Sequence, residues 1–106
     1  MSVTVTSRIP MVRARVRSAV AGAVEKAMLD VEAAAKTTAP VDTGALRNSI
    51  QGERTGEFSG IVAPNVDYAI YVELGTRHMS AQPFLTPAAD EVRPAFEAAV
   101  ARAVRL

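Results

Sequence analysis

Few residues in this sequence are of the types that carry out enzymatic chemistry. The chain of 106 residues has one histidine, His78, which lies in a polar stretch, and it has no cysteine. The lack of cysteine excludes disulfides, thiolate nucleophiles and cysteine-ligated zinc, and a lone exposed histidine is far more often a surface residue than a general base. The sequence contains no P-loop, dinucleotide-binding fingerprint or nucleophile elbow. We therefore expect a protein that is not an enzyme, with no catalytic residue, no metal site and no cofactor.

Two short segments could form phosphate-binding turns if each is taken alone. They are Asp42-Thr43-Gly44 and Glu73-Leu74-Gly75-Thr76. Both fit helix caps and tight turns better, because glycine adopts positive φ without steric cost. We therefore interpret them as structural elements.

A group of basic residues lies near the start of the chain. Arg8, Arg13, Arg15 and Arg17 all precede the first acidic residue, Glu25. Cations near the start of a helix oppose its dipole, so an acidic partner surface or phosphate would stabilise them. The alternative is a solvated basic face. The net charge of +1 argues against a dedicated nucleic-acid or membrane-surface binder.

The apolar residues of the chain are mostly small. There are 20 Ala and 14 Val, against three Phe, two Tyr and no Trp. Burial free energy scales with apolar area, so the core is thin, and small domains often compensate by oligomerising. The length fits one domain, 1–106. With no segment near the roughly 20 apolar residues of a membrane span and no secretory signal, we expect synthesis inside the cell and no membrane partner.

The first third of the chain predicts one long helix. Residues 1–9 form either a short strand, since polar and β-branched residues alternate there, or a flexible arm. From 10 to 38 apolar residues recur at helical spacing, and Ala39-Pro40 ends the pattern. At about 1.5 Å per residue this helix would reach roughly 42 Å. That is longer than a compact domain of this size needs, so we expect it to extend beyond its own sheet and pack on a neighbour.

Residues 40–85 are expected to hold the sheet and the loops that carry the motifs. Asp42 or Thr43 can cap a short helical turn. Two strands are predicted after it, over 49–53 and 58–63, with the turn at 55–57.

The segment 67–76 is ambiguous between helix and strand. Its aromatic and β-branched content favours a strand, whereas Tyr68, Tyr71 and Val72 would share one helical face. Asp67 as a cap and Gly75 after the last turn favour a short helix, which we predict. Residues 78–82 should form a loop or a brief edge strand.

The C-terminal helix is expected over 86–105. Thr86 and Pro87 fit a cap and a first helical position, and Pro94 should kink the helix or delay its regular part. The predicted buried stripe comprises Val92, Phe96, Val100 and Val104. The predicted fold class is α+β: a long N-terminal helix and a C-terminal helix packed on a small, mainly antiparallel sheet of three to four strands.

Three motif blocks occur in a specific order. Residues 39–50 read Ala-Pro-Val-Asp-Thr-Gly-Ala-Leu-Arg-Asn-Ser-Ile, residues 68–76 read Tyr-Ala-Ile-Tyr-Val-Glu-Leu-Gly-Thr, and residues 79–88 contain Pro-Phe-Leu before the last helix. In order and spacing they closely resemble neck and tail-component proteins related to the gene-ten product of phage HK-97. The resemblance covers residues 10–104, and only Pro94 and the short segment before residue 10 depart from it.

The resemblance implies a structural subunit of the head–tail connector of a long-tailed bacteriophage. Such a subunit would form a ring with its own copies, contact the head-closure or adaptor proteins and the tail terminator or tail-tube proteins, and let viral DNA pass without sequence-specific binding. It would be made in the host cytoplasm and reside at the head–tail junction of the virion. A tail terminator or tail-completion protein is the first alternative, and a small nucleic-acid-binding protein the second.

The motif residues are, by this resemblance, determinants of fold and assembly. They are Pro40, Asp42, Thr43, Gly44, Leu46, Tyr68, Tyr71, Glu73, Gly75, Thr76, Pro83, Phe84 and Leu85. The four N-terminal arginines, Arg8, Arg13, Arg15 and Arg17, form a possible patch that faces a partner or DNA.

Overall fold

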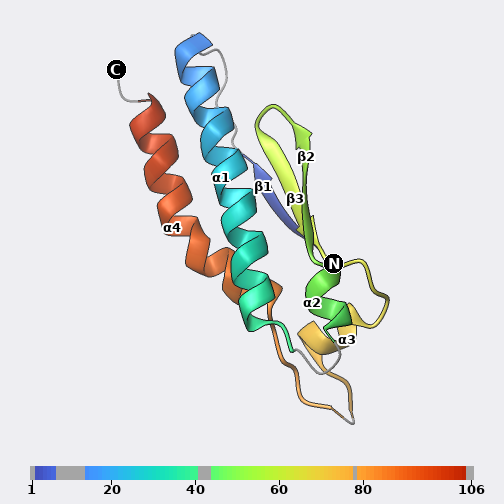
Figure 1. Cartoon of the computed structure of the whole chain (residues 1–106). Helices are drawn as coiled ribbons and strands as arrows, with labels where there is room; N and C mark the ends of the chain where they lie inside the picture. The colour runs from blue at the N-terminus through green and yellow to red at the C-terminus, as the bar shows by residue number, and fades with distance from the viewer. Residues whose placement is uncertain (1, 7–13, 41–43, 78, 105–106) are drawn as a thin grey trace.

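Two long helices and a small sheet make up the fold of this computed structural model, which describes residues 2–6, 14–40, 44–77 and 79–104. The elements in chain order are β1 (Val3–Thr6), α1 (Ala14–Thr38), α2 (Ala45–Ser49), β2 (Gln51–Gly56), β3 (Ser59–Ala63), α3 (Ala69–Leu74) and α4 (Leu85–Val104). The predicted α+β fold class is confirmed (Figure 1). No helix in the described ranges is long and apolar enough to cross a membrane.

The sheet has three antiparallel strands in the order β1-β3-β2. Of the two alternatives predicted for the N-terminal segment, a short strand or a flexible arm, the structure shows the strand, with Val3 opposite Val62. The helix α1 covers one face of the sheet, and α4 packs along α1 and reaches the sheet at β1 (Figure 1). None of the described helices lies over the other face of the sheet (Figure 1).

The core forms where α1 crosses the sheet. Residues of α1 at helical spacing are buried there, including Val24, Met28 and Val31. Met28 lies directly over two strand glycines: a Cβ atom at Gly52 would lie 2.9 Å from the Met28 Cγ, and one at Gly60 would lie 2.9 Å from its Sδ. The two glycines thus allow a long side chain of α1 to pack against the backbone of the sheet.

The outer edge of β2 is covered by an acid from α1. The carboxylate of Glu32 accepts the backbone N–H of Gly52 at 3.1 Å. An edge strand normally leaves such groups free to pair with another strand. One donor of this edge is therefore already satisfied within the chain.

The molecule is elongated. It measures 53 × 20 × 19 Å and has a radius of gyration of 15.4 Å, against about 13 Å for a compact domain of this length. The described part of α1 has 25 residues, or about 37 Å, and it extends beyond the sheet (Figure 1). The predicted overlong helix is confirmed from residue 14 onward, and its residues 10–13 lie outside the described part.

The strand β2 begins two residues and ends three residues later than predicted, whereas β3 begins one residue later and ends at the predicted residue. Ser49 ends α2 instead of starting a strand, and β2 continues through Thr55 and Gly56 because the register shifts between Arg54 and Gly56. The turn therefore falls at residues 57–58.

The predicted N-terminal caps of α3 and α4 were wrong. Tyr68, not Asp67, occupies the cap position of α3, and no side chain bonds there. The helix α4 begins at Leu85, so Thr86 and Pro87 are its second and third residues. The predicted cap residues of α2, Asp42 and Thr43, lie outside the described residues.

The predicted stripe of α4 is buried only near the start of the helix. Val92 is buried, Phe96 and Val100 are half-buried, and Val104 is 41% exposed. The helix continues through Pro94, which is exposed. Burial of this stripe is thus greatest near the start of α4.

Candidate subunit-assembly surface

The second and third motif blocks meet at one buried carboxylate. Glu73, in the last turn of α3, is 7% exposed, and its Oε1 accepts the backbone N–H groups of Phe84 at 3.2 Å and Leu85 at 2.9 Å. The first N–H groups of a helix have no partner within it, and a negative charge there is favourable. Glu73 therefore caps α4 in place of the predicted Thr86. The signal that could have revealed it is an acid within an otherwise apolar block.

The loop between α3 and α4 folds back onto α3. Gly75 has φ of 78°, and a Cβ atom at this position would lie 2.7 Å from the backbone nitrogen of Ala81. The N–H of Gln82 donates to the carbonyl of Val72 at 2.8 Å. Residues 78–82 were predicted to form a loop or a brief edge strand. Among the described residues, Met79 forms an isolated β-bridge with Thr76. His78 lies outside the described residues. Because Gly75 has no side chain, the loop can pass this close to its backbone.

The helix α3 buries a charged side chain and exposes several apolar side chains. Residues advance about 100° around a helix axis, and the arc facing inward carries Ala69 and Glu73, both buried. The outward arc carries Ile70 and Tyr71, 44% and 56% exposed, and Leu74, 69% exposed. The carboxylate that caps α4 thus occupies the inward position of α3, and Tyr68 and Tyr71 are exposed.

The exposed apolar side chains of α3 and its two flanking segments form a group that we call the α3 patch. Its residues are Tyr68, Ile70, Tyr71, Leu74 and Met79, each 41–69% exposed. Monomeric proteins seldom leave so many large apolar side chains together in solvent, and such clusters mark interaction sites. The patch lies at the end of the molecule where α2 and α3 sit, away from the outer ends of α1 and α4 (Figure 1).

The remaining motif residues divide between core and surface. Leu46, Phe84 and Leu85 are buried at 4%, 0% and 2% exposure. Gly44, with φ of 76°, precedes α2, and Pro40 is half-buried. Thr76 and Pro83 are exposed. The structure therefore brings the blocks together at one end of the molecule, where some members build the core and the others form its surface.

A pocket of about 410 Å³ lies between β1, α1 and α4, and we call it the β1–α4 groove. Its lining is mixed, with Phe96 beside Arg93 and Glu97, and its valines Val31 and Val92 are core residues that are only 2% and 9% exposed. It was not anticipated from the sequence, because its walls come from three segments distant along the chain.

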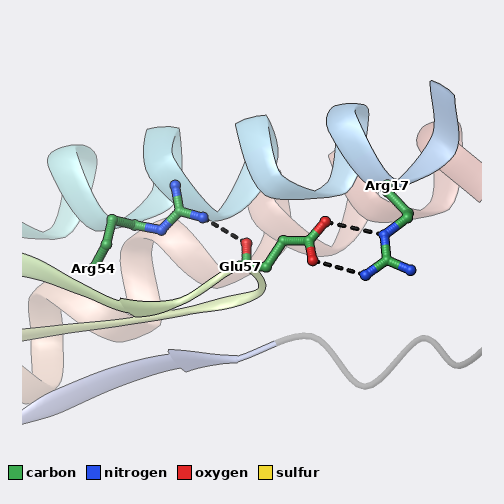
Figure 2. A network of polar contacts seen from close by, with 3 residues as sticks. All are labelled: Arg17, Arg54 and Glu57. Carbon is green, nitrogen blue, oxygen red and sulfur yellow. Dashed lines mark hydrogen bonds and ion pairs between the residues drawn. The ribbon is translucent and has the colours of Figure 1, made fainter. Parts of the chain in front are cut away.

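Of the N-terminal arginines, Arg17 is already paired within the chain. Arg17 binds Glu57 in the β2–β3 turn, with Nε to Oε1 at 3.1 Å and Nη2 to Oε2 at 2.7 Å, and its guanidinium lies 5.5 Å from the ring centre of Phe58. Figure 2 shows this contact and the bond from Arg54 to the carbonyl of Glu57. Arg15 is exposed, and the other two arginines of the group lie outside the described residues.

The contact with Arg17 shifts the ionisation of both partners. The hydrogen bond from Arg17 holds the pKa of Glu57 below its usual range, and the same bond raises the pKa of Arg17. Both groups are therefore more firmly charged than usual. A charge already paired within the chain is less available to DNA or an acidic partner.

No group of three potential metal ligands gathers among the residues that the structure describes. What the described surface offers is suited to protein contacts, at the α3 patch and at the β1–α4 groove.

Comparison with known proteins gives one match. The family model described as "Bacteriophage HK97-gp10, putative tail-component" matches residues 8–75. Neither a curated protein nor a solved structure matches the chain. The matched range holds α1, α2, the β2–β3 hairpin and α3 with its Glu73. It ends before α4, which the same Glu73 caps. Because the match spans well over half of the 106 residues, the chain belongs to the HK97-gp10-like family of phage tail components.

Proposed function

We propose that this chain is a subunit of the head–tail connector of a long-tailed bacteriophage. Copies would form a ring in the neck that joins capsid to tail and leaves an axial channel for DNA. The observation that supports this most is the α3 patch. In a member of a tail-component family, a helix that turns Tyr71 and Leu74 outward and its acid inward has the surface of a subunit that contacts other proteins.

The partners in this proposal are other copies of the chain and the proteins on either side of the ring. Above it would lie a head-closure or adaptor protein, and below it a tail terminator or tail-tube protein. DNA would pass the lumen without sequence-specific recognition. The pairing of Arg17 with Glu57 and the net charge of +1 are consistent with a surface that does not grip DNA.

Disruption of the gene in the phage that carries it tests the proposal. Electron microscopy of the lysate should show DNA-filled heads and separate tails of normal length, and a plasmid copy of the gene should restore joined particles. Tails of irregular length would identify a tail terminator instead. Infectious particles formed without the protein would overturn any role in the virion.

A nucleic-acid-binding role makes a different prediction for the isolated subunit. A binder that neutralises several phosphates loses affinity steeply between about 50 and 200 mM salt. We expect the purified chain to bind duplex DNA weakly at both salt concentrations. Tight binding that is lost across this range, measured by fluorescence anisotropy, would favour the nucleic-acid binder over the connector.

A further inference from the structure

The two edges of the sheet differ in how their backbone groups are satisfied. At the β2 edge, the N–H of Gly52 donates to the carboxylate of Glu32 at 3.1 Å. The strand order β1-β3-β2 makes β1 the other edge. An edge strand carries backbone N–H and C=O groups that can pair with another chain, and the register of the sheet determines which groups of β1 these are.

The register shows that Thr4 turns its backbone groups to the free side of β1. Because Gly52 donates to Glu32, it is not bonded to Val62, its partner in β3. Bonded and non-bonded pairs alternate along an antiparallel ladder, so Val62 turns its N–H and C=O toward Val3 in β1. The next residue, Thr4, therefore points both groups away from β3. No hydrogen bond from a described residue reaches either group.

The β1–α4 groove lies beside this free edge. Its lining includes Thr4 from β1 and Ala89 and Phe96 from α4. Met28 places α1 over β2 and β3, and α4 packs along α1 and reaches the sheet at β1 (Figure 1). Packed helices lie about 8–10 Å apart, which is about two strand spacings. The helix layer is therefore wide enough to cover a fourth strand beside β1, whereas the described sheet has three.

The mixed lining of the groove suits an extended segment. Thr4 offers backbone hydrogen bonds, and the half-buried Phe96 offers an apolar wall. Val3 and Val5 pack toward the helices, whereas the side chain of Thr4 is exposed on the other face. Residues directly opposite each other in a sheet share a face, and successive residues alternate. An added strand should therefore place a polar residue opposite Thr4 and an apolar residue on either side of it.

We infer that the free edge of β1 accepts an extended segment of another protein, which adds a fourth strand beneath α4. The described strands of a second copy are poor donors: β3 is central, β2 is bound at Gly52 by Glu32, and β1 in an antiparallel pair would bring its own α4 into the same space. The inference rests on the proposed connector role for the source of the segment, a protein next to this chain in the virion.

Synthetic peptides that differ only in their methyl groups test the pairing. Each has six residues of alternating threonine and valine, and either the threonine amides or the valine amides are N-methylated. If threonine lies opposite Thr4 and valine faces the helices, only methylated threonines lose a bond to β1. Fluorescence anisotropy with labelled peptides measures binding to the full chain. We expect similar affinities for the unmethylated and valine-methylated peptides, and at least about tenfold weaker binding of the threonine-methylated peptide.

Three variants of the chain test the other side of the contact. Thr4→Pro removes the outward N–H and should still fold, because proline is tolerated on an edge strand where its nitrogen faces solvent. It should bind the unmethylated peptide about fivefold more weakly. Ala89→Arg fills the groove and should abolish binding, whereas Ala98→Arg places the same side chain at an exposed position of α4 outside the groove and should not. Far-UV circular dichroism checks that each variant is folded.

Several results would overturn the inference. Equal binding of the two methylated peptides would exclude backbone pairing at this edge, and normal binding by Ala89→Arg would exclude the groove. Absence of saturable binding up to about 1 mM would exclude a strand-accepting site. Self-association of the unmodified chain that is lost in both Thr4→Pro and Ala89→Arg would mean that a second copy occupies the edge.

Complementation of the gene disruption tests the groove in the particle. We expect Ala98→Arg to restore joined heads and tails and Ala89→Arg to fail. Restoration by both variants would show that the groove is unused in the virion and would leave the connector role intact. Infectious particles formed without the gene would instead remove the connector role, and the peptide measurements would still decide whether the edge accepts a strand.

Discussion

At the scale of single residues, Glu73 explains more of this structure than any other side chain. Its carboxylate is buried within a helix whose outer face is apolar, and it holds the first turn of α4 through two backbone donors. The same contact fixes the direction in which α3 presents Tyr71 and Leu74. One acid therefore links the start of the last helix to the surface that we propose for assembly.

Replacing Glu73 should lower the free energy of unfolding, and the loss should be larger when no hydrogen-bond acceptor remains. Glu73→Ala leaves two buried N–H groups unpaired and should lower the free energy of unfolding by about 3 kcal/mol. Glu73→Gln keeps one carbonyl acceptor and should cost about 1 kcal/mol. Urea unfolding followed by circular dichroism measures both, and equal losses for Ala and Gln would contradict the capping role.

A comparison of Gly75 with Gly44 tests whether the loop after α3 packs closely against the backbone at Gly75. Both have positive φ, but an added Cβ at Gly44 meets only Asn48 Nδ2, at 3.7 Å, whereas at Gly75 it would meet backbone at 2.7 Å. Gly44→Ala should therefore cost about 1 kcal/mol for its φ alone, and Gly75→Ala about 3 kcal/mol or more. Thermal unfolding of the two variants gives the difference, which should vanish if the loop after α3 does not return as described.

At the scale of elements, α1 and α4 form a pair whose two ends are in different environments. Near the sheet, Val92 is 9% exposed, and at the far end Val104 is 41% exposed. The last part of α4 is supported by α1 and not by the sheet. Burial along one periodic stripe thus declines steadily towards the C-terminal end of the helix.

Two valine-to-alanine substitutions should show this difference in burial between the two ends of α4. Val92→Ala should lower the free energy of unfolding by about 2 kcal/mol, because it removes buried apolar volume. Val104→Ala should change it by less than about 0.5 kcal/mol. Denaturant unfolding at equal protein concentration provides the measurement, and a large loss for Val104→Ala would mean that the outer end of α4 is covered in solution.

The contact between α1 and the β2–β3 turn should depend on pH. Because Arg17 lowers the pKa of Glu57 from its ordinary 4.5, the pair stabilises the fold above pH 4.5 and loses this effect as pH falls through the lowered pKa. The unmodified chain should unfold at a higher temperature than Arg17→Met at pH 7. The difference should be small, since both groups are at the surface, and should decrease as the pH falls below 4.5 and Glu57 becomes protonated. A difference that does not decrease as the pH is lowered would contradict an ionic origin.

Much of the element pattern was readable from the sequence, for local reasons. The apolar spacing through Val16, Val20 and Val24 predicted α1, and Gly75 was correctly predicted to end α3. The predicted cap of α4 failed because a tertiary contact decides it. Thr86 had the right chemistry to cap α4, but the carboxylate of Glu73 in α3 occupies that position.

The candidate site was predictable only as a set of motif residues. Its blocks were identified by order and spacing, but which members face outward could not be deduced. A helical pattern in Tyr68, Tyr71 and Val72 suggests a buried face, and only the position of Glu73 shows that the aromatic residues are outside. The β1–α4 groove is formed by three distant segments and has no local signal at all.

At the scale of the whole molecule, the chain is a narrow body with a thin core and an exposed group of apolar side chains at the α3 patch. Its radius of gyration of 15.4 Å exceeds that of a compact domain, so less surface is buried for each residue. A subunit of this kind gains stability when its exposed apolar surfaces are covered.

Stability should therefore depend on protein concentration. Association of folded copies stabilises them by mass action, so a hundredfold increase in concentration should raise the unfolding midpoint of the unmodified chain by about 5 °C or more. The midpoint of Leu74→Glu, which places a charge at the most exposed residue of the α3 patch, should stay constant over the same range. Differential scanning calorimetry would reveal a concentration-independent midpoint for both, if the chain is stable without its neighbours.

The bond from Glu32 to Gly52 has a consequence for copies that have not yet been incorporated. A free sheet edge is a template on which unassembled chains polymerise through their backbones into fibrous aggregates. To add a strand at β2, an incoming chain would have to displace this carboxylate from the N–H of Gly52. Surplus copies in a crowded cell are thereby steered away from strand-to-strand polymerisation at this edge, and their side-chain surfaces remain available for productive incorporation.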